Sequence, residues 1–169
     1  MTELTFTIHG EPCAQGRGRA VVFGGERARV VDPKKSRSWK AYAVGVVLDQ
    51  VGRDRDGAIF PKGTPVELGV RFIFKRPTGS PKTIRTERQV RPKKPDVDNL
   101  AKTVLDALTT AHLWEDDAQV VRLVAEKWQA ELGEAPRIEV CVRVACATGN
   151  NEEAPTEAGR TLFTDGLNT

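Results

Sequence analysis

Residues 66–75, VELGVRFIFK, form the clearest strand in the sequence. Apolar side chains recur there at every second position, which is the period of a β-strand: Val66, Leu68, Val70, Phe72 and Phe74. A second alternating segment at 4–8, LTFTI, places Leu4, Phe6 and Ile8 on one face. The chain is therefore expected to build a sheet with an apolar face.

Shorter patterns predict the remaining elements. AVVF and RARVV flank Gly24-Gly25 and predict a hairpin, while AQVVRLVAEKWQA and RIEVCVRVA predict two strands joined by a short turn. Helical spacing predicts one helix over 37–50, capped by Ser36 or Ser38, and another over 98–112 with an apolar stripe. The stripe consists of Leu100, Val104, Leu105 and Leu108.

Together these patterns predict one small α+β domain over residues 1–147, with a mixed sheet of four to five strands and two main helices. The 76–95 segment has four prolines and many basic residues, which predicts an exposed, mobile loop. Residues 148–169 lack apolar periodicity and are predicted to be an acidic, disordered tail.

Charge is distributed unevenly along the 169 residues. The net charge of +3 is the sum of +9 for residues 1–100 (20 basic, 11 acidic) and −6 for residues 101–169 (6 basic, 12 acidic). No segment approaches the roughly 18 to 20 apolar residues of a membrane span, and the start resembles no signal peptide. The sequence predicts a cytoplasmic protein. Its three cysteines and two isolated histidines indicate neither a disulfide framework nor a zinc site.

Two acidic clusters flank the second predicted helix. PDVDN at 95–99 places Asp96 and Asp98 at the helix start, and WEDDAQ at 114–119 places Asp116 and Asp117 after its end. Helix capping explains one or both of the first pair, since Asp is a favoured N-cap. It does not explain the second cluster, because acidic groups oppose the dipole at a helix C-terminus.

A divalent cation would offset the repulsion if the two clusters meet. Carboxylates without nearby His or Cys favour Mg²⁺ or Mn²⁺ over zinc. Lys102, one turn after Asp98, is predicted to point the same way. The spacing alone leaves both interpretations open, a metal site or capping with solvated loop acids. The adjoining basic RPKKP segment suits a phosphodiester substrate, whose phosphates lysine and arginine neutralise.

The run KPDVDNLAKTVLDALTTAHLWEDDAQVV closely resembles the motif of the RusA family of Holliday junction resolvases over about 28 contiguous residues. The family motif has Asp-x-Asp-Asn-Leu, a Lys one turn on, Leu-Asp-Ala-Leu, and Asp-Asp-x-Gln. The N-terminal GRGRA and DPKKSRSWK segments resemble phage-type members more loosely. Gly18 stands where related sequences often have Pro, and the acidic tail has no counterpart in the family pattern.

The resemblance implies a site, a cofactor and an assembly. The catalytic and metal-binding aspartates fall on Asp96, Asp98 and Asp117, the functional lysine on Lys102, and Asp116 is an additional candidate ligand. The implied protein is a homodimer with a small α+β fold, and its cofactor is Mg²⁺, or Mn²⁺ as a substitute. Its implied reaction is the cutting of four-way DNA junctions by paired nicks, without an organic cofactor.

Basic residues outside the motif are predicted to contact DNA phosphates as a set: Arg17, Arg19, Lys34, Lys35, Arg37, Lys40, Arg91, Lys93 and Lys94. Three alternatives stay open at this point. The chain could be a non-cleaving DNA-binding module of phage or mobile-element origin, a less selective nuclease of branched DNA, or a Mn²⁺-dependent glycosyltransferase using its DxD motif. Asp106 is interpreted as a solvated helix residue, and the three tryptophans as core or interface residues.

Overall fold

A computed structural model describes residues 3–16, 18–23, 27–31, 33–52, 56–79 and 87–145 of the chain. Arg17 and the predicted tail at 148–169 lie outside the described residues, as does Cys146. The elements follow one another in this order: β1 (Glu3–His9), β2 (Arg19–Phe23), β3 (Arg27–Val31), α1 (Lys34–Val51), β4 (Val66–Phe74), β5 (Gln89–Val90), α2 (Val97–Thr110), the 3-10 turn η2 (Asp117–Gln119), β6 (Val120–Gln129) and β7 (Arg137–Val144).

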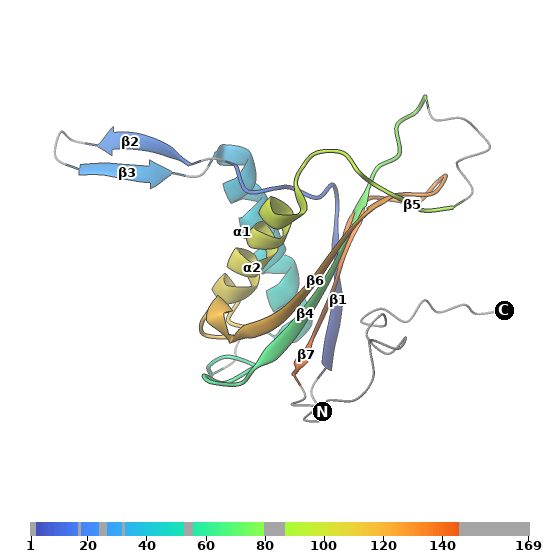
Figure 1. Cartoon of the computed structure of the whole chain (residues 1–169). Coiled ribbons are helices and arrows are strands. Elements are labelled where there is room, and N and C mark those ends of the chain that lie inside the picture. Colours follow the sequence, from blue (N-terminus) through green and yellow to red (C-terminus); the bar gives the residue numbers. More distant parts are fainter. Residues whose placement is uncertain are drawn as a thin grey trace.

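A five-stranded mixed sheet carries both helices on one of its faces (Figure 1). The strand order is β1-β7-β4-β6-β5, and β2 with β3 forms the predicted hairpin as a separate two-stranded sheet. The predicted α+β class, with four to five strands and two main helices, is confirmed.

β4 occupies the centre of the sheet, and seven of its nine residues are buried. Its alternating residues, from Val66 to Phe74, form the middle of the core under the helices. Gly69 and Ile73 on the opposite face are buried as well. β4 pairs parallel to β6 and antiparallel to β7, so both of its edges are hydrogen-bonded within the sheet.

The central position of β4 separates two strands that follow each other closely in sequence. β6 and β7 are joined by residues 130–136, yet β4 lies between them. The connection crosses the end of β4, where the Ala130 N–H donates to the Phe74 carbonyl at 2.9 Å. The gap across β4 is two strand spacings, about 10 Å, which seven residues span easily. The 76–95 segment also differs from the predicted loop, because it contains β5.

α1 begins earlier than the sequence predicted. Pro33, not Ser36 or Ser38, occupies the N-cap position, and the Arg37 N–H donates to the Pro33 carbonyl at 3.1 Å. The fixed φ of proline suits a helix start, and Ser36 is instead buried in the first turn. Lys34, Lys35 and Arg37 therefore all lie in the first two turns of α1.

α2 buries the predicted stripe against the sheet. Leu100, Val104 and Leu108 are fully buried and Leu105 is half-buried. Trp114 is buried just beyond the helix, where its indole N–H donates to Thr109 Oγ1 at 2.7 Å. None of the described helices is long and apolar enough to cross a membrane.

The sheet face away from the helices carries a network of ion pairs. Arg71 contacts Glu126 at 3.1 Å and Glu139 at 3.5 Å, while Arg143 contacts Glu67 at 2.8 Å. These residues sit directly opposite one another in the strand register. Basic and acidic side chains neutralise each other across this face, so it offers little net charge to an anionic ligand.

Candidate active site

The two predicted acidic groups lie at opposite ends of α2. Asp96 is the N-cap residue and Asp98 lies in the first turn, whereas Asp117 follows the other end of the helix in η2. α2 has 14 residues, so it is about 21 Å long at 1.5 Å per residue. Among the described residues, no three His, Cys, Asp or Glu side chains come together as metal ligands. Within one chain, Asp117 therefore does not join Asp96 and Asp98.

The carboxylates of Asp96 and Asp98, at the start of α2, are not used for helix capping. Asp96 makes no side-chain capping hydrogen bond, and only its carbonyl takes part in the first helical turn, accepting from the Leu100 N–H at 3.2 Å. Asp96 and Asp98 are both exposed. The nearest side-chain contact of Asp98 is the Asn99 amide, at a long 3.4 Å. Both carboxylates can therefore accept an external cation.

Lys127 of β6 holds the backbone that leads into Asp96. Its ammonium donates to the carbonyls of Lys93 at 3.0 Å and Pro95 at 2.8 Å. Sequence reasoning missed this residue. The sequence did contain a signal for it. Lys127 lies two residues after Ala125 on the strand face that is directed at the core. A charged side chain in that position needs polar partners.

Replacing Lys127 with Met removes both donors while keeping the length of the side chain. We expect the free energy of unfolding to fall by about 1 to 2 kcal/mol. Amide hydrogen exchange should accelerate selectively over residues 93–98, because the segment loses its anchor. Lys62→Met, at an exposed loop position, is the matched control. Unchanged exchange over this segment would show that Lys127 does not hold it.

Arg91 also holds the segment that leads into Asp96. Its guanidinium donates to the Lys94 carbonyl at 3.1 Å and to Gln129 Oε1 at 2.9 Å, and it stacks over Phe74 at 4.5 Å. The half-buried Arg91 is thus engaged within the protein, unlike Lys93 and Lys94, which are exposed.

Lys102 and Asp106 continue the polar stripe of α2. Lys102 is 59% exposed, and its ammonium lies 3.7 Å from Asp106 Oδ1. The other carboxylate oxygen of Asp106 accepts from Lys40 of α1 at 2.8 Å. The interpretation of Asp106 as a solvated residue is therefore wrong, because it is partly buried between two lysines. Lys40, predicted to contact DNA, forms this ion pair, and its contact with DNA stays a prediction.

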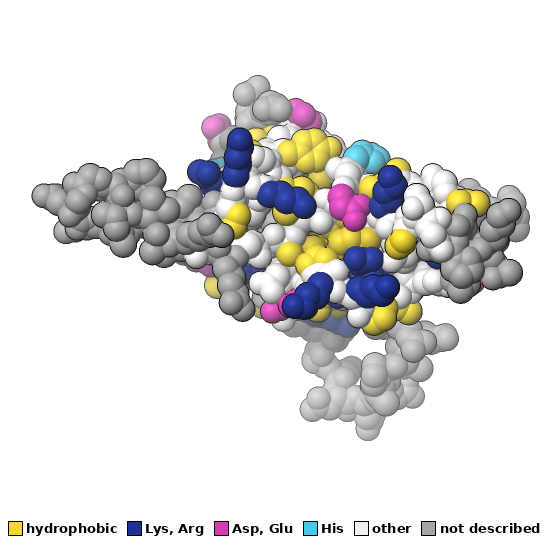
Figure 2. Space-filling view, turned by 90° about the horizontal axis from the view of Figure 1, so that it is seen from above, with side chains coloured by type: hydrophobic (Ala, Val, Ile, Leu, Met, Phe, Trp, Pro, Cys, Tyr) yellow, Lys and Arg dark blue, Asp and Glu magenta, His cyan; other side chains and the backbone are white. Residues whose placement is uncertain are grey.

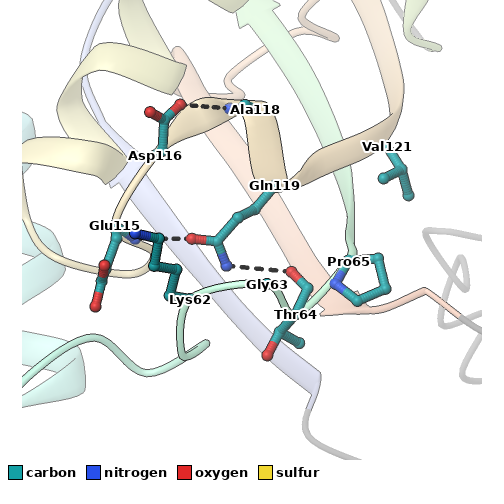
Figure 3. A pocket seen from close by; sticks show the side chains of 9 residues that line it. All are labelled: Lys62, Gly63, Thr64, Pro65, Glu115, Asp116, Ala118, Gln119 and Val121. Atoms are coloured by element: carbon teal, nitrogen blue, oxygen red, sulfur yellow. Dashed lines mark hydrogen bonds between the residues drawn. The ribbon is translucent and has the colours of Figure 1, made fainter.

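Asp116 and Asp117 have different surroundings after α2. The Asp116 carboxylate accepts from the Ala118 N–H at 2.8 Å and so caps η2 (Figure 3). Asp117 is the first residue of η2 and is exposed. Both line an open hollow of about 420 Å³ together with Asp106 and Lys40. Asp116 thus has a structural task, whereas Asp117 has a carboxylate available for a ligand.

Gln119 fixes the turn that carries Asp117. Its side chain is buried, and Oε1 accepts from the Glu115 N–H at 3.1 Å. Nε2 donates to the carbonyls of Pro61 at 2.9 Å and Thr64 at 3.1 Å, so the amide ties the 115–119 turn to the loop before β4 (Figure 3). The sequence marked Gln119 only as a motif position. Its role depends on the 60–64 loop, which is distant in the sequence.

The basic residues gather near the start of α2. α1 and α2 begin at the same end of the molecule (Figure 1), and Lys and Arg side chains are spread over that end with acidic side chains among them (Figure 2). Lys34, Lys35 and Arg37 on α1 are exposed there. Arg19 lies on β2, and its side chain lies outside the described part.

The two described cysteines are unsuited to nucleophilic chemistry. Cys13 and Cys141 are buried and free. Burial raises the pKa of the Cys141 thiol to about 11, and the nearby Glu3 carboxylate adds to the effect. Burial also raises the pKa of Cys13. Both thiols therefore stay protonated near neutral pH.

Comparisons with known proteins match the chain to one family of nucleases. The family model described as Endodeoxyribonuclease RusA matches residues 9–143. An uncharacterized protein of Bacillus subtilis (strain 168), YqaN, is 37% identical over 155 residues, which cover 85% of this chain and 98% of that relative. The crossover junction endodeoxyribonuclease rusA of Lactococcus phage r1t is 31% identical over 91 residues, which cover 54% of this chain and 63% of that relative.

Proposed function

The chain belongs to the RusA family of endodeoxyribonucleases, and from this premise we propose that it resolves four-way DNA junctions by metal-dependent hydrolysis of phosphodiesters. The observation that carries the proposal is the pair of exposed carboxylates at the start of α2, Asp96 and Asp98, on an end of the molecule that also carries exposed lysine and arginine side chains. Neither carboxylate makes a helix-capping hydrogen bond, so both remain available to a ligand.

The donor set fits Mg²⁺, with Mn²⁺ as a substitute. Mg²⁺ is commonly held by one or two carboxylates with water and substrate phosphate completing the shell, and Asp96 with Asp98 supplies such a pair. Bound there, the ion would supply Lewis-acid stabilisation of the phosphate and a stronger nucleophile from water at neutral pH. Lys102, one turn further along α2, is placed to steady negative charge on the scissile phosphate.

Asp117 requires a second copy of the chain to take part. In its own chain it follows the far end of α2, a helix about 21 Å long that begins at Asp96. We propose a two-fold homodimer in which Asp117 of one copy joins Asp96 and Asp98 of the other. Two such sites related by a two-fold axis would cut opposed strands of a symmetric junction as a pair.

DNA is expected on the helix side of the molecule. The opposite sheet face is neutralised by its own ion pairs, including Arg71 with Glu126 and Arg143 with Glu67. Lys40 and Arg91 are engaged internally. The remaining predicted phosphate contacts are Arg17, Arg19, Lys34, Lys35, Arg37, Lys93 and Lys94.

Salt dependence measures how many of these residues contact phosphate. If about six do so, the logarithm of the junction-binding constant should fall against the logarithm of salt concentration with a slope of about −5. Lys34→Gln should reduce the slope by about 1, whereas Arg143→Gln, on the ion-paired face, should leave it unchanged. A slope near zero in the wild-type protein would remove the basic end from the proposal.

The activity itself is tested with labelled four-way, three-way, flap and linear DNAs, incubated with Mg²⁺ or with EDTA. We expect paired cuts in the four-way junction that EDTA abolishes. Equal cutting of all substrates would reject junction selectivity and favour a less selective nuclease. Junction binding without any cutting would favour a non-cleaving DNA-binding module.

A further inference from the structure

We propose that Asp106 is a positioning residue, which holds the Lys102 ammonium away from Asp98 and so keeps that carboxylate open to a metal ion. The inference rests on the proposed function, because it deepens the roles given there to Asp98 and Lys102. Its first observation is the spacing of the polar stripe on α2. Lys102 stands four residues after Asp98 and four residues before Asp106, so it has a carboxylate one turn away on either side.

The geometry of a helix favours the pairing that is not observed. Cα–Cβ bonds tilt toward the N-terminus of a helix, and an acidic residue four positions before a lysine pairs with it better than one four positions after it. Helix geometry therefore predicts that Lys102 pairs with Asp98. Its ammonium instead lies 3.7 Å from Asp106 Oδ1, and among the described residues it makes no ion pair with Asp98.

Asp106 attracts Lys102 more strongly because its carboxylate is fixed from the other helix. Lys40 of α1 donates to Asp106 Oδ2 at 2.8 Å, and α1 packs beside α2 (Figure 1). The side chains of Lys40 and Asp106 are only 20% and 27% accessible, and partly buried charges are screened less than exposed ones. The Asp106 charge is therefore held in one place next to Lys102, whereas Asp98 is exposed to solvent.

A purely structural role explains only half of this arrangement. The hydrogen bond between Lys40 and Asp106 ties α1 to α2, and it uses one carboxylate oxygen. The contact of the other oxygen with Lys102 adds little to the stability of α2, because Lys102 is 59% exposed and exposed ion pairs contribute little. Its consequence is chemical instead, because it decides which carboxylate the Lys102 ammonium neutralises.

An ammonium at Asp98 would compete with a metal ion for the same oxygens. Asp98 makes one long contact, with the Asn99 amide at 3.4 Å, and Asp96 makes no side-chain capping hydrogen bond. Because Asp106 holds Lys102, a divalent cation can bind this pair of carboxylates without first displacing a lysine. The ammonium itself stays exposed one turn away, where it is accessible to a substrate phosphate.

Metal binding without DNA tests the inference. Full-length Asp106→Asn should bind Mn²⁺ about two- to five-fold more weakly than the wild-type protein, because Lys102 then pairs with Asp98 and an exposed pair of this kind has an effect of that size. Electron paramagnetic resonance of free Mn²⁺ measures the affinity. The measurement is made at about 0.15 M salt, which screens the direct effect of the lost charge, since residues 98 and 106 are about 12 Å apart along α2.

Two further substitutions separate this role from a general loss of charge or of packing. Lys102→Met removes the competing ammonium, so adding Asp106→Asn to it should leave the Mn²⁺ affinity unchanged. Lys40→Met breaks the tie between the helices but keeps the Asp106 charge, and it should bind Mn²⁺ like the wild-type protein. The proposal is wrong if Asp106→Asn weakens binding equally with and without Lys102, or if Lys40→Met weakens binding as much as Asp106→Asn does.

Junction cutting, measured in parallel, separates the inference from the proposed function. Unchanged Mn²⁺ binding by Asp106→Asn, when the wild-type protein binds the ion and cuts junctions, would overturn the inference and leave the function standing. Weaker Mn²⁺ binding that depends on Lys102, in a protein whose wild type cuts no DNA, would support the inference and reject the function. A wild-type protein that binds no Mn²⁺ would contradict both.

Discussion

Replacing Asp117 with Asn is expected to lower junction cutting by at least about 100-fold, the scale seen when one group that stabilises a developing charge is removed. Junction affinity should change little. Asp117 is exposed, and the capping of η2 is performed by Asp116. The substitution therefore removes a metal-directed charge without removing a structural contact.

Neighbouring carboxylates provide the controls for this variant. Glu115→Gln changes an exposed acid in the same turn and should cut at the wild-type rate. Asp116→Asn keeps a good capping side chain, so a large loss of cutting in that variant would identify Asp116 as a further ligand. Single-turnover cleavage of a labelled four-way junction, with binding measured in parallel without metal, gives both quantities. Wild-type cutting by Asp117→Asn would remove Asp117 from the site.

The largest expected effect on stability is that of Gln119→Met. The variant keeps the length of the side chain but leaves the carbonyls of Pro61 and Thr64 and the Glu115 N–H without their partner. Each buried group left unpaired costs about 1 to 3 kcal/mol, and because the effects are not additive we expect a total near 3 kcal/mol. For a domain of this size the melting temperature should fall by about 6 to 12 °C.

Denaturant unfolding at several temperatures measures this loss. Gln50→Met is the matched control, because that amide is exposed and makes one long hydrogen bond of 3.4 Å. Gln119→Met should also cut more slowly, since the turn that carries Asp117 loses its attachment to the 60–64 loop. A loss of stability below about 1 kcal/mol would show that water replaces the amide and that the turn is held by other contacts.

The sequence predicted those parts of the fold that depend on local periodicity. The alternation from Val66 to Phe74 predicts a strand, and the stripe from Leu100 to Leu108 predicts a helix with one apolar face; both are confirmed. The start of α1 was predicted too late in the sequence. Serine is a favoured N-cap residue, and Ser36 and Ser38 both follow Pro33, which is the actual N-cap.

The order of the strands could not be predicted from local patterns. A short connection between β6 and β7 suggests neighbours, but β4, the most buried strand, lies between them. Lys127 and Gln119 were missed as structural residues for a related reason. Their partners, Pro95 for Lys127 and the 61–64 loop for Gln119, are 32 or more residues away along the chain.

Which aspartates lie together in the candidate site also could not be predicted from local patterns. The sequence placed Asp96, Asp98 and Asp117 in one group, whereas α2 keeps Asp117 at its far end. A linear motif gives the residue types but not which chain supplies each one. The length of α2 motivates the proposal that two chains share each site.

Mixing two inactive variants tests this central claim most directly. Asp98→Asn and Asp117→Asn are each expected to be inactive alone, and unfolding and refolding them together makes mixed dimers. If each site combines Asp98 of one copy with Asp117 of the other, a mixed dimer has one intact site and one doubly altered site. Random pairing then restores nicking at about a quarter of all sites, with single nicks in place of paired cuts. If the mixture stays as inactive as the two variants alone, the carboxylates act within one chain and the shared site is wrong.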